Sequence, residues 1–255
     1  FLRTALSVPV PRPPTHPGYE QPWCAPLSPL AAVEVPSPVQ QDPTGALPSV
    51  GVSLESRDLW KKFHTYGTEM VITRPGRRMF PVLKVEVTGL KPNGYYMLLL
   101  DMVPLDEYRY RYLGRCWLPL GVVDPDDHPR PTLYLHEKGP SLGADWMAGP
   151  VSFANVKLTN QEVNSGKHMM LHSMRKYIPR IHVFAGSDVL QLDYRRFKTF
   201  IFPETSFIAV TAYQSEEVIA LKIEHNPYAR SFYTNGERRS NAKRLLDEES
   251  VSDEE

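Results

Sequence analysis

The strongest constraint on the fold is a succession of short apolar segments of strand type between residues 82 and 214. In MFPVLKVEVTGL, apolar and polar side chains alternate from Leu83 to Thr88, which is the period of a strand with one buried face. The run YYMLLLDMV at 95–103 is continuously apolar and favours a strand buried on both faces. Further segments of this kind, separated by turns, occupy 132–136, 150–159, 168–174, 180–186, 197–202 and 206–214. The pattern predicts a mainly β protein, built as a sandwich or barrel.

Helices are expected only at the two edges of this region. In SLESRDLWKKFHTYG, the spacing of Leu59, Trp60 and Phe63 is helical, a serine (Ser53 or Ser56) is available as N-cap, and Gly67 is placed to end the helix. In SEEVIALKIEHNP, Ser215 is the expected cap and Pro227 the expected stop. The expected apolar stripe of this second helix consists of Val218, Ile219, Leu221 and Ile223.

Composition divides the chain into three parts. Residues 1–50 hold 12 of the 25 prolines, and we expect a disordered segment there, more as a flexible leader than as a ligand for proline-binding modules. Residues 51–236 form the expected folded domain, and 237–255 a flexible tail that is basic and then acidic. Residues 51–240 carry 25 basic and 20 acidic side chains, a balance that permits nucleic-acid binding without requiring it.

The sequence offers little to support catalysis, a cofactor, a metal or a membrane span. It has no nucleophile elbow, phosphate loop or dinucleotide fingerprint, and no apolar run of about 18 residues. His168 and His172 are four apart in an expected strand, a span of about 13 Å that one metal ion cannot bridge. Cys24 and Cys116 form no Cys-x-x-Cys pair, and we do not expect them to be bridged because Cys24 lies in the proline-rich segment. We therefore expect no enzyme, cofactor, metal or membrane association.

The segment NPYARSF at 226–232 places two aromatic residues at the edge of the ordered region. Asn226 is positioned to cap a short helix that Pro227 begins, so Tyr228 and Phe232 would share one face with Arg230 nearby. The rings either anchor a terminal helix to the core or are presented to a partner. Apolar wedges beside basic residues are one way in which proteins enter a DNA minor groove.

Basic residues cluster at several expected turns. GRRMFP carries Arg77 and Arg78 after a glycine, and VKLTN carries Lys157 and Thr159. MRKYIPRIH carries Arg175, Lys176 and Arg180, which we expect to bracket a turn. Each cluster alone is most often a solvated charge, but loops at one end of a sandwich would bring several together as an anion-binding rim.

Several long motifs together resemble the DNA-binding domain of the T-box family of transcription factors over about residues 52 to 235. They are, in chain order, EMVITRPGRRMFPVLKVEVTGL, PVSFANVKLTN, HSMRKYIPRIHV, FPETSFIAVTAYQSEEVIALKI and NPYARSF. The resemblance implies an immunoglobulin-like β-sandwich or barrel of about seven strands with short C-terminal helices. It implies a nuclear, sequence-specific transcription factor that binds AGGTGTGA-type elements in duplex DNA and regulates RNA polymerase II transcription in development. Homodimers on paired sites and transcriptional co-regulators are the further partners that it implies.

The resemblance also assigns roles to residues. Arg77 and Arg78 would serve the major-groove side, Lys157, Thr159 and Arg180 the DNA backbone, and Tyr228 and Phe232 the minor groove. The full set of DNA-binding residues that it implies is Arg77, Arg78, Lys157, Thr159, Arg180, Thr211, Asn226, Pro227, Tyr228, Arg230 and Phe232.

The chain departs from the family pattern in ways that keep a second function open. Tyr228 and Arg230 stand where the family usually has Phe and Lys, and Asp145 and Ala148 replace a common His and Lys. LGVVDPDD replaces a loop that carries Gly-Lys. Fewer cations near phosphate weaken non-specific binding. The alternative to a transcription factor is therefore a protein-interaction module that keeps the T-box fold with weakened DNA binding.

Overall fold

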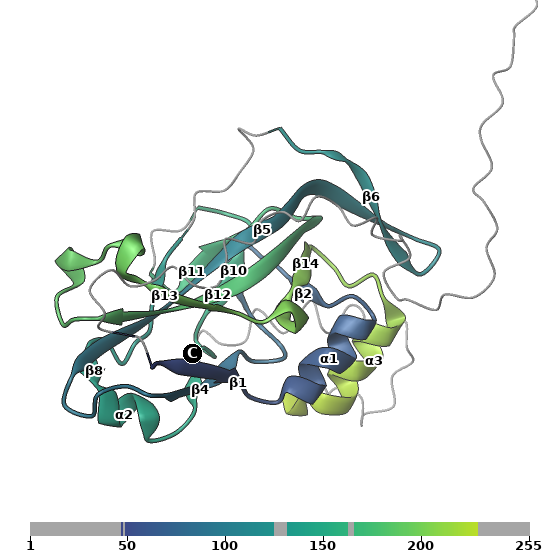
Figure 1. Cartoon of the computed structure of the whole chain (residues 1–255). Coiled ribbons are helices and arrows are strands. Elements are labelled where there is room, and N and C mark those ends of the chain that lie inside the picture. Colours follow the sequence, from purple (N-terminus) through teal and green to yellow (C-terminus); the bar gives the residue numbers. More distant parts are fainter. Residues whose placement is uncertain (1–46, 48, 125–131, 163–165, 229–255) are drawn as a thin grey trace, which may run out of the picture.

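The computed structural model describes residues 47, 49–124, 132–162 and 166–228 (Figure 1). Most of the expected proline-rich segment, the expected tail 237–255, Arg230 and Phe232 lie outside these residues. Within them the protein is mainly β, as predicted, with few helices. The strand segments β1 to β14 outnumber the expected set of about seven, because many of them are only two to four residues long.

The largest sheet is built around two long antiparallel strands, β5 (Tyr95–Leu113) and β12 (Arg175–Ala185), which cross the molecule side by side (Figure 1). The apolar run at 95–103 forms the first half of β5, and its residues 96–102 are all buried, as that run predicts. The sheet order is β2-β14-β12-β5-β6, with β13 on β12 and β7 and β8 on β5. The remaining bounds are β2 Glu69–Val71, β14 Phe207–Val210, β6 Cys116–Val122, β13 Lys198–Ile201, β7 Tyr134–Leu135 and β8 Ser141–Leu142.

Two smaller sheets complete the β-structure. One has the order β1-β4-β9, from β1 (Gly51–Leu54), β4 (Lys84–Thr88) and β9 (Val151–Ser152). The alternation expected in β4 is present, because Val85 and Val87 are buried and their polar neighbours are exposed. Side chains of this sheet and of the large sheet share one apolar core. The other small sheet, β11-β10-β3, is formed by β11 (His168–Met170), β10 (Lys157–Thr159) and β3 (Arg77–Arg78).

The expected turn at MRKYIPRIH is wrong, because these residues lie inside β12. β12 pairs with β14 through residues 175–177 and with β13 through residues 180–183, while β5 runs along its other edge. Pro179 falls where β12 exchanges one partner for the other, so its missing N–H interrupts neither ladder. The expected single strand at 150–159 is likewise divided into β9 and β10 by a turn in which the Val156 N–H donates to the Phe153 carbonyl at 3.2 Å.

Helices α1 (Arg57–Thr65) and α3 (Glu216–His225) lie beside each other at one end of the molecule (Figure 1), and both pack against a second apolar cluster. Gly67 follows α1 with φ 77°, as expected of a residue that ends a helix. Ser56 occupies the N-cap position of α1, but its backbone is left-handed and its side chain makes no capping bond. The remaining helical segments are α2 (Gly143–Met147) and three short 3-10 helices, η1 Val189–Gln191, η2 Tyr194–Arg196 and η3 Pro203–Thr205.

Two core residues lie on the N-terminal side of residue 51, where the folded domain is expected to begin. Leu47 and Val50 are buried in the main core, and the Leu47 carbonyl accepts a hydrogen bond from Lys198 Nζ at 3.1 Å. The local composition around Leu47 resembles the proline-rich segment, and the local sequence does not predict its contact with Lys198 of β13, 151 residues away.

A chain that begins at Gly51 is therefore expected to be less stable than one that begins at Leu47. It lacks two buried apolar side chains, and a buried Leu alone is worth roughly 2–5 kcal/mol. Urea unfolding of the two truncated chains measures the difference. Equal unfolding midpoints would show that the Leu47 and Val50 contacts contribute nothing to stability.

Two further expectations concern the cysteines and the membrane. Cys116, half-buried at the start of β6, is disulfide-bonded, which corrects the expectation of unbridged cysteines. Cys24 lies outside the described residues. No helix in the described ranges is long and apolar enough to span a membrane.

Candidate nucleic-acid interface

The small sheet β11-β10-β3 places three basic side chains in one row. Lys157 of β10 pairs in register with Arg78 of β3 on one side and with His168 of β11 on the other. Residues paired across neighbouring strands point to the same face of a sheet. We call Arg78, Lys157 and His168 the basic row. Neither Arg78, which is exposed, nor Lys157 makes an ion pair with any residue that the structure describes.

The loop before β3 lies against two members of the basic row, Lys157 and His168. Gly76 has φ 83°, and a Cβ there would lie 2.6 Å from His168 Cδ2 and 2.9 Å from Lys157 Cβ. Only glycine therefore fits without displacing two members of the basic row. His168 Nε2 also lies 3.0 Å from the Pro75 carbonyl oxygen, so β11 is held against the loop that carries Arg77 and Arg78.

Arg77 points to the other face of the same strand. It pairs in register with Leu158, which is fully buried, and is itself half-buried. Its Nη1 is buried and has no hydrogen-bond partner among the described residues. The guanidinium thus keeps hydrogen-bonding capacity that the neighbouring protein groups leave unused.

A buried lysine of α3 lies close to Arg77. The Lys222 ammonium donates to the Phe80 carbonyl at 3.0 Å and lies over the rings of Tyr213, at 4.6 Å, and Phe63, at 5.9 Å. Burial lowers the pKa of Lys222 to about 7, with a further decrease from the positive charge of Arg77 and a partial opposing effect of Glu69.

Glu69 of β2 fixes the other end of α3. Its carboxylate accepts hydrogen bonds from the backbone N–H groups of Gln214, at 2.7 Å, and Ser215, at 2.9 Å, and from the Trp117 indole at 3.2 Å. Burial raises the pKa of Glu69, while these three hydrogen bonds and Lys222 oppose that rise. Ser215 then caps α3 as predicted, accepting from the Val218 N–H at 3.2 Å.

The lowered pKa of Lys222 predicts how stability depends on pH. Between about pH 7 and the ordinary lysine value near 10.4, the unfolded chain binds a proton that the native protein does not, so stability rises with pH across this window. Wild type is expected to gain about 1 kcal/mol per pH unit over the Lys222→Met variant, which lacks the titrating group. Urea unfolding of both proteins at pH 7, 8 and 9 measures this, and groups remote from Lys222 cancel in the difference. Parallel curves would contradict it.

The end of α3 leads directly into the expected aromatic segment. The Asn226 N–H donates to the Lys222 carbonyl at 2.8 Å, which ends α3. The Asn226 side-chain oxygen then accepts from the Tyr228 N–H at 3.1 Å, the bond that an N-cap makes, and Pro227 and Tyr228 have helical backbone. Tyr228 is 73% exposed. Asn226, Pro227 and Tyr228 therefore begin a new helical turn next to α3.

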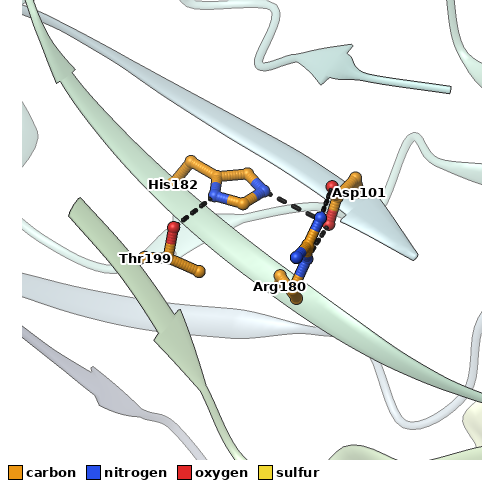
Figure 2. Close-up of polar contacts among 4 residues, drawn as sticks. All are labelled: Asp101, Arg180, His182 and Thr199. Carbon is orange, nitrogen blue, oxygen red and sulfur yellow. Dashed lines mark hydrogen bonds and ion pairs between the residues drawn. The ribbon is translucent and has the colours of Figure 1, made fainter. Parts of the chain in front are cut away.

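Other predicted site residues do not join this surface. Arg180 donates from Nε to Asp101 Oδ1 at 2.8 Å, and His182, two residues further along β12, also turns toward Asp101 and lies 2.8 Å from Thr199 Oγ1 (Figure 2). Burial opposes ionisation of Asp101, but its bonds to Arg180 and His182 hold its pKa below the usual value. The Arg180 charge is thus already paired inside the large sheet.

The remaining candidates divide between structural and surface positions. Thr159 is fully buried, and its hydroxyl donates to the Arg74 carbonyl at 3.2 Å, so it holds the β3 loop in place. Thr211 is exposed just after β14. Arg175 and Lys176 were expected on an anion-binding rim, but both are buried in β12. Arg175 Nη2 donates to the Asp106 carbonyl at 3.2 Å, and Lys176 Nζ lies over the Tyr110 ring at 4.7 Å.

Three residues of this region could not be identified from the sequence. His168 resembles an ordinary strand histidine, and its place in the basic row appears only from the parallel pairing of β11 with β10. Glu69 and Lys222 look like solvated charges of a strand edge and a helix. The described residues hold no group of three or more side chains suited to a metal ion.

Comparison with known proteins gives a consistent result. The family model of the T-box matches residues 52–234. T-box transcription factor TBX6 of Gorilla gorilla gorilla and that of Homo sapiens are each 46% identical to the chain over 226 residues, 87% of the chain and 51% of each relative. The chain thus spans about half the length of these relatives.

Proposed function

Because the chain belongs to the T-box family, we propose that it is a sequence-specific DNA-binding transcription factor. It recognises AGGTGTGA-type elements in duplex DNA, works in the nucleus and regulates RNA polymerase II transcription in development. The observation that carries the proposal is the placement of Arg77 opposite the basic row. The two-residue strand β3 presents a half-buried arginine that forms no ion pair with any described residue, and on its other face lies a row with one exposed and two half-buried members.

The two faces of β3 suit different parts of DNA. Arginine binds guanine through the O6 and N7 atoms, and Arg77 is a half-buried arginine that forms no ion pair with any described residue, so we assign base recognition to it. Arg78 is exposed and Lys157 half-buried, and neither forms an ion pair with a described residue, which suits contact with phosphates. His168, the third member of the basic row, is assigned to the same backbone contact.

The turn that Asn226 caps is assigned to the minor groove. Pro227 and Tyr228 are exposed directly after α3, and a ring next to a base step serves as an apolar wedge. Arg230 and Phe232 lie outside the described residues, and we assign them to the same contact on the family resemblance alone. Thr211 remains an assigned backbone contact, whereas Thr159 and Arg180 are better suited to support the interface than to touch DNA. Homodimers on paired sites and transcriptional co-regulators belong to the same proposal.

The alternative, a protein-interaction module with weakened DNA binding, is favoured by one observation. The charge of Arg180, one of the expected backbone contacts, is paired with Asp101, which leaves fewer cations for phosphates. Selection of bound sites from random duplex DNA separates the two functions. A transcription factor enriches the AGGTGTGA element, whereas an interaction module enriches no sequence.

Tyr228→Ala is expected to weaken DNA binding by on the order of 1 kcal/mol or more while leaving the melting temperature nearly unchanged, since the ring is exposed and fills no core space. Titration of duplex DNA and one melting curve give both values. Tyr95→Ala is the matched control, because Tyr95 is an exposed tyrosine at the start of β5, away from α3 (Figure 1). A melting temperature that falls while affinity per folded molecule holds would mean that Tyr228 anchors the fold instead.

A further inference from the structure

The two assigned DNA-reading elements are far apart in sequence but are joined by a short series of hydrogen bonds through Lys222. Phe80, three residues after Arg77, offers its carbonyl oxygen to Lys222 Nζ, 142 residues further along the chain. The carbonyl of Lys222 itself accepts from the Asn226 N–H, and Asn226 accepts from the Tyr228 N–H. Lys222 is the only residue of this series that touches both the Phe80 segment and Asn226.

The N-terminal half of α3 is held by contacts other than Lys222, so the bond between Lys222 and the Phe80 carbonyl determines where the C-terminal end of the helix lies. Glu69 holds the backbone N–H groups at the start of the helix, and Val218 is buried one turn before Lys222. A helix held at both ends cannot slide along its axis. The placement of the Asn226–Tyr228 turn relative to Arg77 then depends on the bond at the C-terminal end, between Lys222 and Phe80.

Stability alone does not explain a lysine here. Burying an ammonium group is costly, and an apolar side chain of similar volume in the same place is often neutral or stabilising. The rings of Phe63 and Tyr213 and the sulfur of Met70, which lies 4.0 Å from Nζ, would surround a methionine equally well. What an apolar side chain cannot supply is the directional bond to the Phe80 carbonyl.

We propose that Lys222 is a positioning residue that sets the spacing between the Arg77 strand and the Asn226–Tyr228 turn, so that the major-groove and minor-groove contacts engage one duplex together. This inference rests on the proposed function. Lys222 need not touch DNA, and its effect falls on sequence-specific binding, because non-specific binding tolerates a change of spacing.

The test compares Lys222→Met with wild type on a duplex that contains AGGTGTGA and on a scrambled duplex of the same composition. Lys62→Met is the control, since it removes a lysine from the exposed surface of α1. Lys222→Met is expected to bind the specific duplex on the order of tenfold more weakly and the scrambled duplex nearly unchanged. Affinities are expressed per folded molecule, from melting curves of each variant. Lys62→Met is expected to leave the ratio of the two affinities as in wild type.

A double-mutant cycle adds a result that a merely structural role would not produce. In wild type, the losses caused by Arg77→Ala and Tyr228→Ala are expected to be non-additive on the specific duplex, whereas in the Lys222→Met background they should add. If Lys222→Met does not fold, Lys222→Gln takes its place. Its amide can donate a hydrogen bond, but the side chain is shorter than that of lysine. The ratio of its affinities for the specific and scrambled duplexes is expected to lie between the wild-type ratio and one.

The outcomes separate the two proposals. A wild-type protein that does not prefer the AGGTGTGA duplex overturns the proposed function itself. The positioning role alone is overturned if wild type prefers the AGGTGTGA duplex and a folded Lys222 variant behaves like wild type. Such a variant would have the same ratio of affinities for the two duplexes and the same coupling between Arg77 and Tyr228.

Discussion

Glu69→Ala is expected to lower the free energy of unfolding by roughly 3 kcal/mol or more, because each buried donor left without an acceptor costs about 1–3 kcal/mol. The substitution removes the acceptor of three donors at once: the buried Ser215 N–H group and Trp117 indole, and the part-buried Gln214 N–H group. It also removes the nearest negative charge that favours the ammonium of Lys222. Urea unfolding measures the loss.

Two variants bracket this result. Glu86→Ala removes the same side chain from an exposed position of β4 and is expected to change stability by less than about 0.5 kcal/mol. Glu69→Gln keeps one acceptor oxygen and should fall between the two. A Glu69→Ala protein as stable as Glu86→Ala would mean that water replaces the carboxylate, and that Glu69 does not hold α3.

Arg77→Ala is expected to cost roughly 1–3 kcal/mol on the AGGTGTGA duplex and much less on random DNA, since a bidentate contact with guanine discriminates between bases. The basis in the structure is a half-buried side chain on the face of β3 opposite the basic row, without an ion pair to any described residue. Titrations of both duplexes at one salt concentration give the two losses.

Arg78→Ala is the matched control for this experiment. Arg78 is the next residue of the same strand but is exposed and belongs to the basic row, so its loss should weaken both duplexes about equally and reduce the salt dependence by about one charge. Equal losses for Arg77→Ala on both duplexes would make it a phosphate contact, and base recognition would then lie elsewhere.

The parts of the fold that local pattern determines were predictable. The alternation around Val85 and the continuous run at 95–103 gave β4 and the first half of β5 their correct burial. Ser215 and Gly67 were correctly placed at helix ends, because the chemistry of a cap is local. The turn expected in MRKYIPRIH was wrong, because the tolerance of Pro179 within β12 depends on where two other strands, β13 and β14, begin and end.

The candidate site was predictable to a similar extent. Arg77, Arg78 and Lys157 stood out as basic residues near turns, and family resemblance singled out Tyr228. Which of them share a face depends on pairing between β3, β10 and β11, which no local pattern reports. Burial of Lys222 and Glu69 was out of reach for the same reason: each is stabilised by partners from another part of the chain, and a charged residue alone predicts exposure.

Paired titrations across a salt series measure whether the protein binds DNA in a sequence-specific way. One duplex contains AGGTGTGA and the other a scrambled sequence of the same composition. As a sequence-specific DNA-binding protein, the chain should bind the first at least about a thousandfold more tightly than the second. The logarithm of both association constants should fall linearly with the logarithm of salt concentration, as phosphate contacts displace counterions. Equal affinity for the two duplexes, or binding that does not respond to salt, would contradict sequence-specific DNA binding and favour the protein-interaction module.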